Sequence, residues 1–89
     1  MASITRNGGE SGTVMIVITE VYVNQAELSE LLDRLRIHFS RYRHDVGFSD
    51  RDVVVMCSLR NDEQLPFPDA PAEAIVRWLT PWADQHSVA

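Results

Sequence analysis

The stretch that decides the fold is residues 14–23, VMIVITEVYV, together with the capped segment that follows it. The run is dominated by β-branched residues and is too short for a typical helix, so it predicts a strand. Its first half is apolar at every position, whereas Thr19, Glu20 and Tyr22 add polar groups further along. Burial is therefore expected to be deepest near residues 16–18.

A helix is predicted to begin at Asn24, because Asn is a good N-cap and Glu27 stands three residues later as the reciprocal acid of a capping box. This helix is expected to continue through the arginine-rich residues toward Gly47 as its stop. Apolar residues recur with the spacing of a helix that lies on a sheet, at Leu28, Leu31, Leu32, Leu35, Phe39 and Tyr42.

Residues 53–59, VVVMCSL, predict a second strand that is covered on both faces. A strand, a long helix and a strand in this order predict a parallel pair joined by a right-handed crossover. The proline-containing segment 60–71 is expected to be a loop. A closing helix should follow, with its inward side formed by Ile75, Val76, Leu79 and Trp82.

The fold class predicted is α+β, a small two-layer sandwich with one or two strands before the first helix and then a strand and a second helix, so that two helices cover a sheet of two or three strands. Residues 1–12 are interpreted either as a flexible tail or as an edge strand that forms a hairpin, and residues 13–86 as a single domain with a frayed tail at 87–89. Two strands alone make a poor sheet, so dimerisation is expected to extend it.

The strand at residues 15–23 and the amphipathic helix after it resemble the start of antibiotic-biosynthesis-monooxygenase-like domains. That resemblance implies a dimeric ferredoxin-like fold. The family has two strands between its helices and a fourth strand after the second helix, whereas this sequence predicts one strand between the helices and none after residue 82. No site residue is therefore transferred from the family.

The net charge of −5 and the pI of about 4.9 argue against general nucleic-acid binding, because a phosphate backbone repels a negative field. All eight basic residues are Arg, which a GC-rich genome of the bacterial type explains, and residues 34–44 hold four of them without an acid. A single cysteine and the lack of a long apolar run lead us to expect a soluble protein of the cytoplasm, with no membrane contact.

No catalytic constellation, metal site or cofactor motif is predicted. Cys57 lies in an apolar strand, where it is interpreted as a small buried side chain. The histidines and acids around the first helix match no spacing known for metal ligands; they are His38, His44, Asp45, Asp50 and Asp52. The glycines at 8, 9 and 12 precede a strand, whereas a phosphate loop follows one.

The leading functional hypothesis is a non-catalytic interaction or regulatory module that forms a homodimer through a sheet edge or the closing helix and binds another protein. Its candidate contact residues are Trp78, Trp82, Tyr22, Arg41 and Arg43. One alternative is a small dimeric ferredoxin-like enzyme or ligand-binding protein, monooxygenase-like, with a pocket between the first helix and the sheet near Tyr22, His38 and Trp78. Another is an acidic inhibitor of a nucleic-acid-binding protein.

Overall fold

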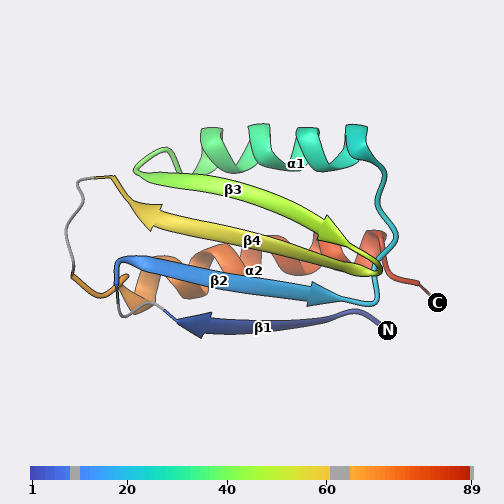
Figure 1. The fold of residues 1–89 in the computed structure, drawn as a ribbon, viewed down its shortest axis with the longest axis horizontal. Coiled ribbons are helices and arrows are strands. Elements are labelled where there is room, and N and C mark those ends of the chain that lie inside the picture. Colours follow the sequence, from blue (N-terminus) through green and yellow to red (C-terminus); the bar gives the residue numbers. More distant parts are fainter. Residues whose placement is uncertain (9–10, 61–64, 89) are drawn as a thin grey trace.

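The computed structural model describes residues 1–8, 11–60 and 65–88, and these form a four-stranded sheet and two helices (Figure 1). Neither helix in this part of the chain has the length and apolar character that crossing a membrane requires. In chain order the elements are β1 (Ser3–Gly8), β2 (Thr13–Thr19), α1 (Gln25–His38), β3 (Tyr42–Ser49), β4 (Asp52–Leu59) and α2 (Asp69–Gln85).

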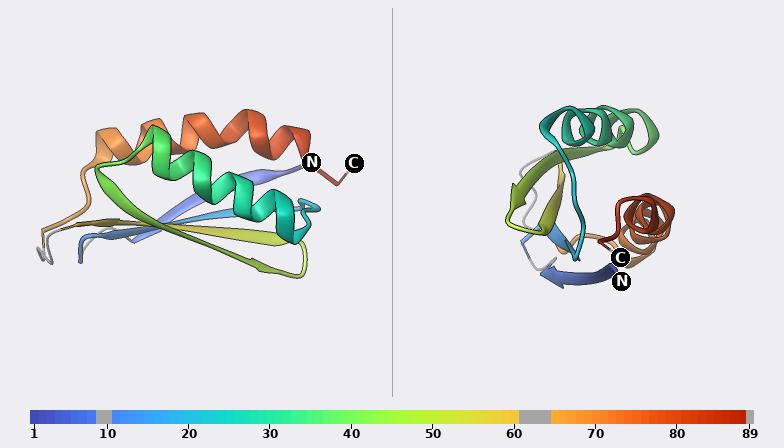
Figure 2. Two further views of the ribbon diagram at one scale, coloured as in Figure 1. Left: turned by 90° about the horizontal axis from the view of Figure 1, so that it is seen from above. Right: turned by 90° about the vertical axis from the view of Figure 1, so that its right-hand side faces the viewer.

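The sheet has the order β1-β2-β4-β3, and every neighbouring pair is antiparallel. Both helices lie on the same face of this sheet, which curves around them (Figure 2). The α+β class is therefore confirmed. The predicted sheet of two or three strands is wrong, because four strands are present.

The strand missed by the sequence analysis is β3, which occupies residues predicted to be the last turns of the first helix and the loop after it. Helix α1 ends at His38, and Phe39 has left the helical conformation at φ −126°. The apolar positions Phe39 and Tyr42 fit a helical stripe, but Tyr42 also begins the alternation of a strand whose inward residues are His44 and Val46. Pairing with β4 decides between the two patterns, since a central strand needs hydrogen-bond partners on both sides.

The predicted parallel β-α-β unit is also corrected. Strands β2 and β4 are antiparallel, and α1 instead connects β2 to β3. Because both β2 and β3 are antiparallel to β4, they run in the same direction with β4 between them. This is a split β-α-β unit, the building block of ferredoxin-like sheets.

Of the two alternatives for the N-terminal segment, a flexible tail or an edge strand, the structure shows the edge strand. Strand β1 pairs with β2 from Ser3 opposite Thr19 to Gly8 opposite Val14. It lies beside β2, where the last strand of a ferredoxin-like sheet would lie, so the arrangement resembles that sheet with its final strand moved to the start of the chain. The two ends of the chain accordingly meet, since the Ala2 amide donates to Ser87 Oγ at 3.0 Å.

The tail is held by backbone hydrogen bonds as far as it is described. Ser87 forms a bridge with Val21, and the amide of Val88 donates to the carbonyl of Glu20 at 2.9 Å. Residue 89, the other part of the segment predicted to fray, lies outside the described residues.

The core lies between the sheet and the two helices. Strands β2 and β4 each turn every second side chain toward it, and the helices close it from above. Its fully buried members include Val14, Ile16, Ile18, Leu31, Leu35, Val53, Val55, Cys57, Ile75 and Leu79.

The start of α1 has the predicted capping box. The Asn24 side chain accepts from the Glu27 amide at 2.8 Å, and Glu27 Oε1 accepts from the Asn24 amide at 3.0 Å. We expect Asn24→Ala to lower the free energy of unfolding by about 1 kcal/mol, because a backbone donor loses its partner. Urea unfolding measures the change. Asn24→Ser, which keeps an acceptor, is the control, and equal losses in the two variants would contradict the assignment.

Candidate functional site

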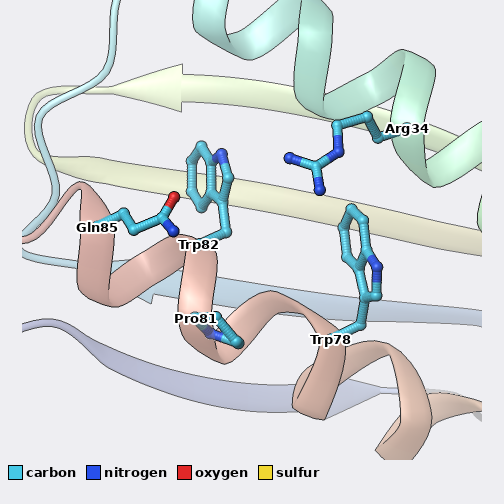
Figure 3. Close-up of a pocket in the computed structure, with 5 residues that line it drawn as sticks. All are labelled: Arg34, Trp78, Pro81, Trp82 and Gln85. Carbon is cyan, nitrogen blue, oxygen red and sulfur yellow. The ribbon is translucent and has the colours of Figure 1, made fainter.

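A groove with aromatic walls lies between α1 and α2. Trp78 and Trp82 project from successive turns of α2 toward α1, and Arg34 reaches toward them from α1 (Figure 3). The cavity here has a volume of about 260 Å³, and we call it the interhelical groove; its lining is Arg34, Trp78, Pro81, Trp82 and Gln85. A smaller cavity of about 120 Å³ adjoins it and shares Arg34, Trp82 and Gln85 with it.

Trp78 joins the two helices at the end of α1. Its ring centroid lies 5.2 Å from that of His38 and 5.8 Å from that of Phe39, which it meets edge to face. The Cζ atom of Arg34 lies 5.4 Å from the centre of the Trp78 ring, within cation-π distance. Trp78 is consequently half-buried by its own chain rather than projecting freely.

Trp82 is buried and is positioned by the end of α2. His86 stacks on it with centroids 4.4 Å apart, and the two ring nitrogens of His86 hydrogen-bond to the Trp82 carbonyl and to Glu27 Oε2, both at 2.9 Å. The Asn24 amide, and after it His86, lower the pKa of Glu27. The Glu27 carboxylate that caps α1 thus also binds His86 at the end of α2.

The five predicted contact residues do not form one surface. Trp78 and Trp82 share the interhelical groove, whereas Tyr22 is 78% exposed just before α1 and Arg41 and Arg43 are exposed beyond its other end. Helix α1 has 14 residues and is therefore about 20 Å long. The predicted grouping of Tyr22 with His38 and Trp78 is not found, because Tyr22 precedes α1 and His38 ends it.

A separate groove of about 340 Å³ does lie between the first helix and the edge of the sheet. It is bounded by α1 and β3, and its lining is Gln25, Leu28, Ser29, Leu32, Val46, Gly47 and Phe48. None of these side chains is charged, and the Ser29 hydroxyl has no general base among the other lining residues that could activate it. This groove offers apolar contact rather than chemistry.

The structure brings Cys57 and His44 together, which the sequence analysis did not predict. His44 Nδ1 lies 3.4 Å from Cys57 Sγ, and His44 Nε2 lies 2.7 Å from the Phe39 carbonyl oxygen. The carbonyl only accepts, so Nε2 carries the proton and Nδ1 accepts from the thiol. The register of β3 on β4, with His44 opposite Cys57, is the signal that would have found this pair.

The electrostatics of this pair oppose a nucleophile. Burial raises the pKa of the Cys57 thiol to about 12. Burial also lowers the pKa of His44, and the charges of Arg60 and Arg36 lower it further, against the opposite effect of the hydrogen bond to Phe39. A neutral imidazole beside a neutral thiol links β4 to the end of α1 and leaves little thiolate for catalysis.

The histidines and acids considered as metal ligands are dispersed. His38 ends α1 and His44 is buried, while Asp50 and Asp52 lie at the β3–β4 turn, at the opposite end of β3 from His44. Within residues 1–8, 11–60 and 65–88, no three His, Cys, Asp or Glu side chains gather as a metal site would require.

The face of the sheet opposite the helices carries an apolar centre. Met15 lies directly opposite Met56, and Val17 opposite Val54, in the pairing of β2 with β4. The two Met side chains are 39% and 38% exposed, and both Val side chains are half-buried. We call these four residues the open sheet face. No element of the described chain packs over it, because both helices lie on the other side (Figure 2).

Comparisons of the chain with protein-family models, with curated proteins and with solved structures found no match.

The buried position of His44 predicts a pH dependence of stability. Its pKa is lower in the folded protein, so the unfolded chain takes up the proton first and stability is lost as pH falls below about 6.5. We expect His44→Gln, which keeps an N–H for the Phe39 carbonyl, to reduce this slope by up to about 1.4 kcal/mol per pH unit. Urea unfolding between pH 8 and 5 measures it. The control His38→Gln should retain the wild-type slope, and an unchanged slope in His44→Gln would refute the assignment.

The burial of Cys57 predicts a protected thiol. We expect a thiol-reactive disulfide reagent at pH 8 to label the native protein only through opening of the fold, because the thiol is inaccessible and its pKa is raised. Labelling should become fast in urea above the unfolding midpoint. Rapid stoichiometric labelling of the native protein would show that Cys57 is reactive after all.

Proposed function

We propose that this protein is a non-catalytic interaction module that forms a homodimer through its open sheet face. The observation that supports this most directly is the pair of exposed methionines, Met15 and Met56, side by side at the centre of a sheet face. A small domain buries a limited share of its surface, and contiguous apolar surface that remains exposed favours association.

The residues around the open sheet face favour a second copy as the partner. In a two-fold dimer the same surface stands on both sides, so it must be compatible with itself. Strand β1 contributes Ser3, Thr5 and Asn7 beside this face, all uncharged. Two uncharged apolar centres can meet without electrostatic cost, although each chain carries a net charge of −5.

Strand β3 borders the other side with one charge of each sign. Arg43 lies opposite Ser58 and Asp45 opposite Met56, on the same side of the sheet as the apolar centre. Opposite charges two residues apart at the rim are also compatible with a two-fold partner, where they add orientation more than affinity.

The proposed interface differs from the sheet edge and closing helix expected from sequence. The aromatic side chains of α2 that motivated the closing helix face α1 across the interhelical groove and contact this chain. The open sheet face instead offers flexible Met side chains, which adapt well to a partner surface. A sheet-on-sheet dimer would bury it in the manner of a β-sandwich core.

We expect Met56→Lys to raise the dimer dissociation constant by about 100-fold or more, or about 2.7 kcal/mol, because it places a charge at the centre of an apolar interface, where Asp45 on the neighbouring strand offsets only part of the desolvation cost. Light scattering and sedimentation equilibrium over a dilution series measure the constant. The matched control is Ile37→Lys, which changes a side chain on α1 that is 76% exposed.

The control should retain the wild-type dissociation constant, and circular dichroism should show both variants folded. A wild-type protein that remains monomeric at high concentration would refute the proposal. Equal weakening by both variants would also refute it, because it would show that added positive charge, rather than the open sheet face, controls association.

A further inference from the structure

The aromatic side chains between the helices form two groups, one around Trp78 and one around Trp82, and the interhelical groove separates them. His86 stacks on Trp82 at 4.4 Å, and Trp78 contacts His38 and Phe39 at the other end. Between Trp78 and Trp82 lies the interhelical groove of about 260 Å³, with the two indole rings on either side of it (Figure 3). The two residues are one helical turn apart, which separates their backbones by about 5.4 to 6 Å along the axis.

A positively charged side chain, that of Arg34, also lies at the groove. The guanidinium of Arg34 reaches in from α1 and lies over the Trp78 ring. In the described part of the chain no carboxylate oxygen comes within 4.0 Å of it, even though Glu30 lies one turn away on the same helix. Arg presents a planar fork that matches a carboxylate, and the Trp78 ring beneath the guanidinium positions this fork at the groove.

We propose that the interhelical groove is a binding site for a small planar aromatic carboxylate. The ring lies between the indoles of Trp78 and Trp82, and the carboxylate accepts hydrogen bonds from Arg34. A volume just below the usual range for ligand pockets selects a molecule of one ring or two fused rings. Glu27 and Glu30 line the adjoining cavity and disfavour a second negative charge, so the ligand is a monoanion.

The probe is benzoate, and the readout is NMR of the two indole Nε1–H groups, one from each tryptophan, assigned with Trp78→Phe and Trp82→Phe. Both signals should shift on a single saturation curve. Benzyl alcohol keeps the ring without the charge, and cyclohexanecarboxylate keeps the charge without the planar ring. Each should bind about tenfold or more weakly than benzoate, since each lacks one of the two contacts.

The decisive variant is Arg34→Gln, which should weaken benzoate by about tenfold and abolish its advantage over benzyl alcohol. Arg36→Gln is the matched control, because Arg36 is an exposed arginine on the same helix that does not line the groove. It should bind benzoate as the wild type does. Far-ultraviolet circular dichroism should show both variants folded.

Several outcomes would overturn the site. They are the absence of indole shifts with benzoate, an equal loss in the two Arg variants, or tighter binding of benzylamine than of benzoate, which would indicate a cation site. The two helices that line the groove lie on one side of the sheet (Figure 2), and the open sheet face is the other side. Met56→Lys should therefore leave benzoate binding unchanged, and failure of either proposal can be recognised without the other.

Discussion

The antiparallel pairing of β2 with β4 is the constraint on which the rest of the structure depends. These two central strands are apolar on both faces, and their inward side chains meet row by row, with Ile16 opposite Val55. Both faces of this strand pair therefore favour packing against another layer, but the helices of the described residues lie on only one of them. The helical layer with its groove and the exposed apolar centre on the reverse side are two consequences of the same pair.

The helical layer is held together by polar contacts at its two ends. At one end Glu27 both caps α1 and binds His86 at the end of α2. At the other end His44 connects Cys57 of β4 with the carbonyl of Phe39, where α1 stops. The first contact joins the two helices, and the second fixes the end of α1 to the sheet, where Trp78 of α2 packs on His38 and Phe39.

Local sequence was sufficient wherever one pattern had a single structural meaning. The capping box at Asn24, the helix after Pro68 and the part of the predicted strand 14–23 that ends at Thr19 were all predictable, because caps, β-branched runs and helical spacing act over a few residues. Local sequence failed where two patterns overlapped. Phe39 and Tyr42 extend the helical stripe of α1, yet Tyr42 belongs to β3, since pairing with β4 stabilises that segment more than another helical turn would.

The sequence by itself determined the α+β class, the single core and the start of the first helix, because these follow from composition, apolar periodicity and capping. Only the tertiary structure decided the strand order, the meeting of His44 with Cys57, and the placement of Trp78 and Trp82 against Arg34. Each of these depends on contacts between residues far apart in the chain. The relative positions of these residues are set by strand pairing and helix packing, which no short stretch of sequence encodes.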